Sequence, residues 1–186
     1  LGVDFLSLSA HKFYGPKGIG ILYVKNRKTI DSLLIGGSQE NGLRGGTENV
    51  VSIAGAGLAA KICCENIEEN SKKLKMLQNY FISEIKKSFP DLKLNSKSEN
   101  TLPGLVNISF PGFKSDILMA KLDRLNIAVS SGSACGSGSP KPSKVLNEIG
   151  VEKSLNLSSL RISFGSTNSM DEVKILIKKL SQILNN

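Results

Sequence analysis

The feature that most constrains the fold is a long stretch, residues 50–89, in which apolar side chains recur at helical spacing and lysines and glutamates lie between them. The apolar positions are Ile53, Leu58, Ile62, Ile67, Leu74, Leu77, Phe81 and Ile85. Pro90 ends the pattern because proline cannot continue a helix. We therefore predict one long helix or two, joining the parts of the chain on either side.

The part before this helix contains short apolar runs separated by turns. Residues 3–8 and 19–24 read as strands, and the turn between them is formed by residues 15–18, Gly-Pro-Lys-Gly. Residues 28–34 are expected to form a helical turn, and the glycine-rich residues 36–46 an irregular loop. This pattern predicts two strands with a functional loop between them.

The part after the helix alternates between strands and helices. We predict strands at 105–110, 126–130 and 160–164, and helices at 115–125, 142–149 and 170–184. Residues 132–140 are too rich in glycine and serine for regular structure and are expected to be mobile. The predicted domains are 1–65, part of a larger domain, and 66–186, a smaller α+β domain.

Composition limits the classes of function. The net charge is +8 and the pI about 9.4, but the lysines are scattered along amphipathic helices, so we expect no direct nucleic-acid binding. No uncharged apolar run approaches the roughly 18 residues of a membrane span, and the expected location is cytoplasmic. Since the sequence opens on a strand-like run without methionine, we expect further residues before Leu1.

The three cysteines match neither a zinc site nor a disulfide framework, and no metal site is predicted. Cys63 and Cys64 are adjacent in the predicted helix and point about 100° apart, so we interpret them as small core-facing residues. Cys135 is flanked by glycines and serines, which predicts an accessible thiol.

A lysine follows the first predicted strand within Ser9-Ala10-His11-Lys12-Phe-Tyr-Gly-Pro-Lys-Gly. A lysine in that place suits Schiff-base chemistry, although alone it is more commonly a solvated edge charge. The whole segment resembles the class V, fold-type I pyridoxal-phosphate (PLP) enzymes, most closely the cysteine desulfurases of the NifS/IscS type. The resemblance implies that Lys12 binds PLP covalently and that Ser9 and His11 hold its phosphate.

A second segment, Arg44-Gly-Gly-Thr47-Glu-Asn49, looks like the Arg-x-Gly-Thr segment of these enzymes. The resemblance implies that Thr47 reaches the PLP phosphate of the opposite subunit. The expected assembly is therefore an obligate homodimer with composite active sites.

The segment Ser130-Ser-Gly-Ser-Ala-Cys135 is close to the group I desulfurase signature, and Pro-Ser-x-Val-Leu at 142–146 extends the match. The resemblance implies that Cys135 accepts the substrate sulfur. Arg161, on a predicted strand, needs an anionic partner, which is ordinarily a protein carboxylate. The resemblance instead implies that Arg161 pairs with the α-carboxylate of L-cysteine.

Taken together, the resemblance implies an α/β chain comprising the end of the large parallel-sheet domain and a smaller carboxy-terminal domain of a fold-type I enzyme. Its activity would convert L-cysteine to L-alanine and an enzyme persulfide, for iron–sulfur cluster assembly or tRNA thiolation, with a matching acceptor protein. Alternatives are a selenocysteine lyase, another class V lyase or aminotransferase, or a non-catalytic piece. We expect the amino-terminal half to precede Leu1 and the isolated chain to be inactive.

Overall fold

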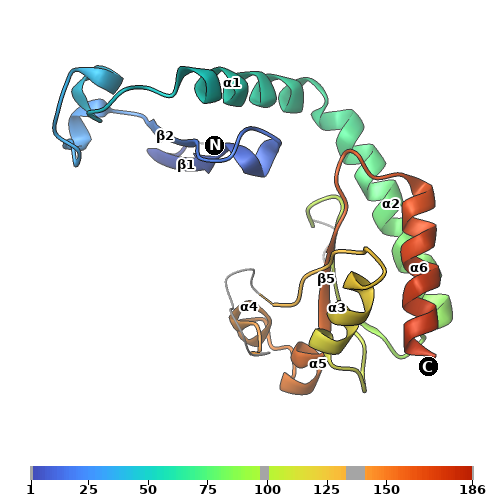
Figure 1. The fold of residues 1–186 in the computed structure, drawn as a ribbon. Helices are drawn as coiled ribbons and strands as arrows, with labels where there is room; N and C mark the ends of the chain where they lie inside the picture. The colour runs from blue at the N-terminus through green and yellow to red at the C-terminus, as the bar shows by residue number, and fades with distance from the viewer. Residues whose placement is uncertain (1, 97–100, 133–140, 186) are drawn as a thin grey trace. The chain divides into compact units, whose positions relative to one another are not determined.

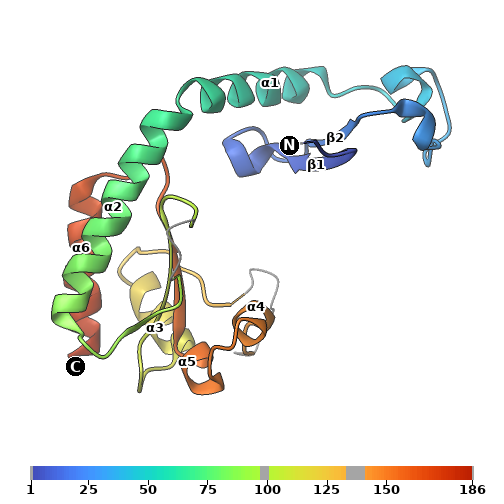
Figure 2. The same cartoon turned by 180° about the vertical axis from the view of Figure 1, so that it is seen from behind.

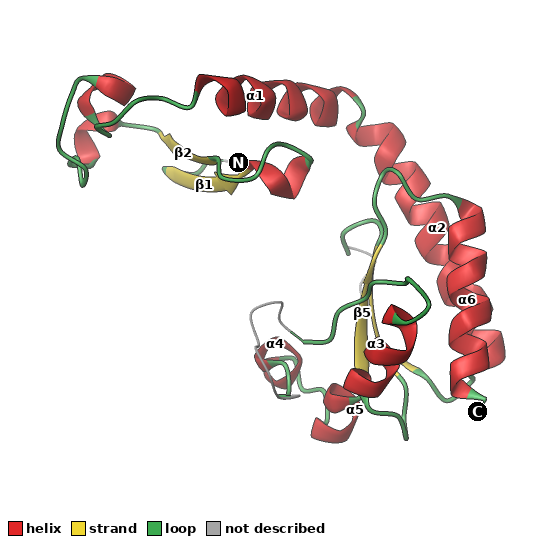
Figure 3. Cartoon of the chain, viewed as in Figure 1, coloured by secondary structure: helices red, strands yellow, loops and turns green. Residues whose placement is uncertain are grey.

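The computed structural model describes residues 2–96, 101–132 and 141–185 (Figure 1). Contacts between residues divide the chain into two compact units, Leu1–Ile67 and Glu68–Asn186. Figure 3 shows that each unit combines helices and strands. The domain ranges 1–65 and 66–186 remain a prediction for the complete protein.

The first unit begins with an antiparallel hairpin. Strands β1 (Phe5–Ser9) and β2 (Gly20–Val24) pair from Phe5↔Val24 to Ser9↔Gly20. Strand β1 begins two residues later and ends one residue later than its predicted run, and β2 begins one residue later than its own. Three short 3-10 turns and one long helix complete the unit: η1 (Ala10–Phe13), η2 (Arg27–Thr29), η3 (Gln39–Gly42) and α1 (Val50–Glu65).

This hairpin buries little by itself. Among the described residues of the first unit, the fully buried apolar side chains are Ala10 and Ala56. Phe5, Leu22 and Tyr23 remain 49%, 58% and 48% exposed, although they belong to both strands. A two-stranded hairpin is marginally stable alone because it has no second layer to cover its faces.

The predicted helical stretch is two helices, α1 and α2 (Ile67–Ser88). The break falls at Asn66, whose side-chain amide and backbone N–H both donate to the Ile62 carbonyl, at 2.8 and 3.2 Å, and so cap the end of α1. No single helix among the described residues is long and apolar enough to span a membrane; only α1 and α2 taken together, across their break, would pass on length and composition.

The second unit is built around a three-stranded antiparallel sheet in the order β3–β4–β5. Its strands are β3 (Lys93–Leu94), β4 (Leu105–Ser109) and β5 (Ser159–Ser163). Its helices besides α2 are α3 (Ser115–Asp123), α4 (Lys144–Glu148), α5 (Lys153–Leu157) and α6 (Met170–Leu184). The predictions missed β3 and α5, which are both very short.

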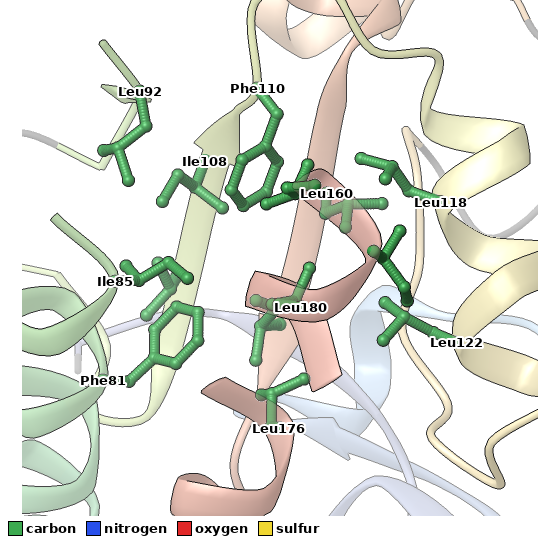
Figure 4. Close-up of a cluster of buried hydrophobic side chains, with 14 of the residues drawn as sticks. Phe81, Ile85, Leu92, Ile108, Phe110, Leu118, Leu122, Leu160, Leu176 and Leu180 are labelled. Atoms are coloured by element: carbon green, nitrogen blue, oxygen red, sulfur yellow. The ribbon is translucent and has the colours of Figure 1, made fainter. Parts of the chain in front are cut away.

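Helices α2 and α6 lie side by side in both views of the chain (Figures 1 and 2). With α3 they bury one face of the sheet (Figure 4), where Phe81, Leu118, Leu160 and Leu180 are at most 1% exposed. The ring of Phe81 also meets Phe164 edge to face, with centroids 5.9 Å apart. This apolar layer is the core of the second unit.

The last helix, α6, has the predicted bounds because its start is capped on both sides. The Ser169 hydroxyl accepts from the Glu172 backbone N–H at 3.2 Å, and the Glu172 carboxylate accepts from the Ser169 N–H at 2.8 Å. These bonds to the carboxylate, first from the Ser169 backbone and then from the Asn168 side chain, lower the pKa of Glu172 below its usual value.

The strand predicted at 126–130 is wrong. Asn126 adopts a left-handed conformation with φ of 58°, which ends the turn after α3 and leaves the following residues without a ladder. Only Ser130 pairs with a strand, through an isolated bridge to Arg161.

We predict that Phe81→Ala lowers the free energy of unfolding by about 3–5 kcal/mol, because it empties a fully buried site between α2 and the sheet. Urea unfolding followed by circular dichroism measures the change. Met76→Ala, on the same helix but 54% exposed, is the matched control and is expected to change it by less than about 0.5 kcal/mol. Equal effects of the two substitutions would contradict the core described above.

Candidate cofactor and substrate site

Lys12 lies in the 3-10 turn that directly follows β1. The turn is fixed at its base by Ala10, which is fully buried and whose N–H donates to the Ile19 carbonyl at 3.0 Å. Its end is fixed by the Gly15 N–H, which donates to the Ala10 carbonyl at 2.9 Å. The backbone that carries Lys12 is thus held at the end of the hairpin.

The side chains of Ser9, His11 and Lys12 are all exposed. Within the described part of the chain, none of them makes a hydrogen bond or an ion pair through its side chain. An amine, a hydroxyl and a ring N–H are therefore presented together at one strand end without internal partners. This donor set fits PLP, whose aldehyde takes an amine and whose phosphate takes neutral and charged donors.

Helix α1 supports this turn from two positions. The Cys63 thiol donates to the Phe13 carbonyl at 3.3 Å. Gly55 faces Pro16 so closely that a Cβ on it would lie 2.9 Å from the Pro16 Cγ. Cys63 is accordingly half-buried, as expected, but the same expectation is wrong for Cys64, which is exposed because it points to a different side of the helix.

Thr47 lies in the glycine-rich loop that leads into α1. The loop is closed by the Gly45 N–H, which donates to the Leu34 carbonyl at 2.8 Å, and a Cβ on Gly45 would come within 2.8 Å of the Gly36 Cα. Two residues after Thr47, Asn49 caps α1 by accepting from the Ser52 N–H at 3.2 Å. Thr47 is exposed between these two braced segments.

Arg161 occupies the middle of β5, in the second unit. Its backbone exchanges two hydrogen bonds with Ser130, at 2.6 and 3.0 Å. The ion pairs among the described residues, Lys25–Asp4, Lys61–Glu65, Lys87–Glu84 and Lys174–Asp171, do not include it. The protein carboxylate that ordinarily pairs with such an arginine is therefore not found in this part of the chain.

Cys135 lies outside the described residues, but both ends of its segment are defined. Gly132 precedes the segment, and Lys141 follows it. The two sides lie close together, since a Cβ on Gly132 would be 3.9 Å from the Lys141 carbonyl oxygen and from the Ser143 Cβ. The Ser143 backbone is in turn held by Asn156, which accepts from its N–H at 2.8 Å and donates to its carbonyl at 2.9 Å. The described residues on the two sides of Cys135 thus lie together, two positions along the chain from Ser130.

The structure brings the predicted residues together in two groups. Ser9, His11 and Lys12 share one turn of the first unit, and Arg161 adjoins the start of the Cys135 segment in the second. Sequence reasoning missed Asn95 and Asn107, which lie on the same sheet face as Arg161; the signal was a polar residue inside the apolar run 105–110. The described residues contain no cluster of three or more metal-ligating side chains.

We predict that Gly55→Ala and Gly57→Ala have opposite effects. Both replace a glycine in α1, but a Cβ at Gly57 meets nothing within 4 Å, so that change should stabilise by about 0.5–1 kcal/mol through helix propensity. A Cβ at Gly55 must push Pro16 and the lysine turn away. Amide hydrogen exchange by mass spectrometry should therefore rise at residues 10–18 for Gly55→Ala only. The same protection in both variants would show that α1 does not brace the turn.

Comparison with known proteins gives a consistent set of similarities. The model of the family described as aminotransferase class-V matches residues 1–176. The cysteine desulfurase IscS of Dictyoglomus turgidum is 41% identical over 184 residues, covering 99% of this chain and 47% of that protein. The human cysteine desulfurase is 36% identical over 182 residues, covering 97% of this chain and 39% of that protein.

Solved structures agree with the sequence comparison. A NifS-like protein from Rickettsia africae is 34% identical, with a TM-score of 0.87, and its alignment covers all of this chain and 48% of the other. A second NifS-like protein has 34% identity and a TM-score of 0.88, with 99% and 47% coverage. The predicted α/β fold class is confirmed. The chain spans about half the length of the relatives it matches.

Proposed function

Because this chain belongs to the class-V aminotransferase family, as its motifs predicted, we propose that it forms the carboxy-terminal half of a PLP-dependent cysteine desulfurase. The reaction proposed is removal of sulfur from L-cysteine, which gives L-alanine and a persulfide on Cys135. Relatives at 36% to 41% identity bear the name cysteine desulfurase, and the similarity extends over nearly the whole chain.

The observation that carries the proposal is the backbone pairing of Ser130 with Arg161. Cys135 lies five positions after Ser130, and a fully extended chain of that length spans at most roughly 18 Å. The thiol is therefore tethered to the residue proposed to hold the substrate carboxylate. A class V lyase or aminotransferase without sulfur transfer has no need of this tether.

In the proposed reaction Arg161 orients L-cysteine through a forked pair with its α-carboxylate. The Cys135 thiolate attacks the substrate sulfur, an S–S bond forms, and the C–S bond breaks with its electrons left on carbon. When bound, PLP supplies the sink for those electrons. The carbon finally takes up a proton and leaves as alanine, so no external oxidant or reductant is needed.

The residues at the end of β1 have the cofactor roles in this proposal. Lys12 would hold the cofactor through its amine and would move protons there, while Ser9 and His11 would donate to the phosphate. Their exposure, and the absence of side-chain partners for them among the described residues, support these roles. The equally exposed Lys17, in the turn before β2, is assigned no role.

The proposal also includes the assembly in which this site works. Thr47, exposed on a braced loop, would complete the phosphate site of a second copy. The proposed enzyme is therefore a homodimer. Its proposed location is the cytoplasm. Large apolar side chains are exposed on both strands of the first unit, and in this proposal the rest of the full-length protein covers them. The persulfide would pass to an iron–sulfur scaffold or a tRNA-thiolation protein.

The test compares Cys135→Ser with Cys64→Ser in the full-length protein supplied with PLP and L-cysteine. We expect Cys135→Ser to keep the visible absorption of the bound cofactor. Its rate of alanine formation should fall at least about a thousandfold, because the attacking thiolate is gone. Cys64→Ser, which changes an exposed thiol of the first unit, should retain the wild-type rate.

Alanine formation at the normal rate by Cys135→Ser would remove Cys135 from the reaction. The lyase alternative would then replace the desulfurase. Absence of alanine formation from L-cysteine by the wild-type protein, with PLP bound, would reject the desulfurase, and release of alanine from L-selenocysteine would then identify a lyase.

A further inference from the structure

The two faces of the β4–β5 pair differ sharply in chemistry. Side chains of successive residues alternate between faces, and Val106, Ile108, Leu160 and Ile162, at most 3% exposed, lie on the core face. The opposite face, which we call the Arg161 face, carries Arg161 with the residues paired around it. These are Lys93, Leu105, Asn107, Ser109, Ser130, Ser159 and Ser163.

Asn107 is the cross-strand neighbour of Arg161 on this face. The N–H and carbonyl of Arg161 both bond to Ser130, so they point away from β4. Asn107 and Arg161 consequently form a non-hydrogen-bonded pair, the type in which opposite side chains approach most closely, with Cβ atoms about 4.5–5.5 Å apart.

The Asn107 amide is held in place from its other side. Its Oδ1 accepts from the Asn95 Nδ2 at 2.8 Å, and its backbone N–H donates to the Ser96 hydroxyl at 3.0 Å. The Asn95 backbone N–H also donates to the Asn107 carbonyl, at 2.9 Å. The Asn107 oxygen thus already accepts one hydrogen bond, and the amide, being neutral, offers the guanidinium no negative charge.

The rest of the network is neutral. Asn95 Nδ2 also lies 2.8 Å from the Ser109 hydroxyl and 3.2 Å from the Ser159 hydroxyl; with two hydrogens it serves two of its three acceptors at a time. Ser109 and Ser159 are bonded to each other at 2.8 Å. The Arg161 face has no carboxylate at any paired position, and Lys93 adds a second positive charge.

We propose that Asn107 is a positioning residue that keeps Arg161 available for a substrate carboxylate. Fixed by Asn95, its amide packs beside the guanidinium without offering it an anion. With no carboxylate paired to it in the described part of the chain, the positive charge of Arg161 is left for a small carboxylate that arrives from outside. This inference rests on the proposed function, since it specifies how the site selects the α-carboxylate of L-cysteine.

Asn107→Asp tests the inference, because it changes the shape little but places a carboxylate beside Arg161. In the full-length enzyme we expect KM for L-cysteine to rise about ten- to a hundredfold, with kcat within about threefold of wild type. Asn107→Ala removes the support without adding a competitor, and should raise KM about three- to tenfold. The matched control is Asn79→Asp, the same charge change on an exposed position of α2, which should leave KM unchanged.

A binding measurement separates positioning from a purely structural role. The change in cofactor absorption on adding L-alanine or L-alaninamide reports the two affinities. Asn107→Asp should weaken binding of L-alanine, which has a carboxylate, and leave that of L-alaninamide unchanged. Equal weakening of both ligands, or an unchanged KM, would overturn the inference. Should Asn107→Asp not fold, an unchanged KM in Asn107→Ala would overturn it equally.

Arg161→Ala distinguishes failure of this inference from failure of the proposed function. If Arg161→Ala raises KM for L-cysteine and Asn107→Asp does not, only the role of Asn107 is lost. If Arg161→Ala leaves KM unchanged, the assignment of Arg161 in the proposed function is wrong. A wild-type enzyme that makes no alanine would reject the proposed function itself.

Discussion

The arrangement of the second unit depends on the register of β5. Leu160 and Ile162 must face α2, α3 and α6, because they supply the sheet's part of the core. Side chains alternate along a strand, so this requirement places Arg161 on the opposite face. A shift of one residue would bury the guanidinium in the core and expose both apolar side chains, at a cost far above that of any single contact. The hydrophobic core therefore fixes where the arginine is presented.

That placement also determines where the described chain leads into the segment of Cys135. Ser130 pairs with the free edge of β5 opposite Arg161, and the far end of the segment is anchored by Ser143 on Asn156. In the first unit, an analogous constraint fixes Lys12, since β1 ends one turn before it and α1 packs on that turn through Gly55 and Cys63. In both units, the residues with proposed chemical roles lie within or directly after a rigid element, which limits their loss of entropy on binding.

Much of this could be predicted from the sequence where local signals agree. The bounds of α6 were predicted from an amphipathic pattern that begins with the acidic Asp171 and Glu172, and the structure adds a capping box at Ser169 and Glu172. The strand at 126–130 failed because apolar content resembles a strand, whereas pairing depends on partners distant in sequence. Short elements such as β3 have no periodicity to detect. Asn107 was overlooked because its role depends on Asn95 and Arg161, which are far from it along the chain.

The measurement that tests the account most directly is the location of sulfur after one turnover. The full-length protein, loaded with PLP, is mixed with one equivalent of L-cysteine, alkylated to trap persulfides, and analysed by peptide mass spectrometry. The account predicts that the added sulfur is found on the peptide that contains Cys135. Sulfur on the peptide that contains Cys63 and Cys64, or alanine formed without any enzyme persulfide, would contradict it.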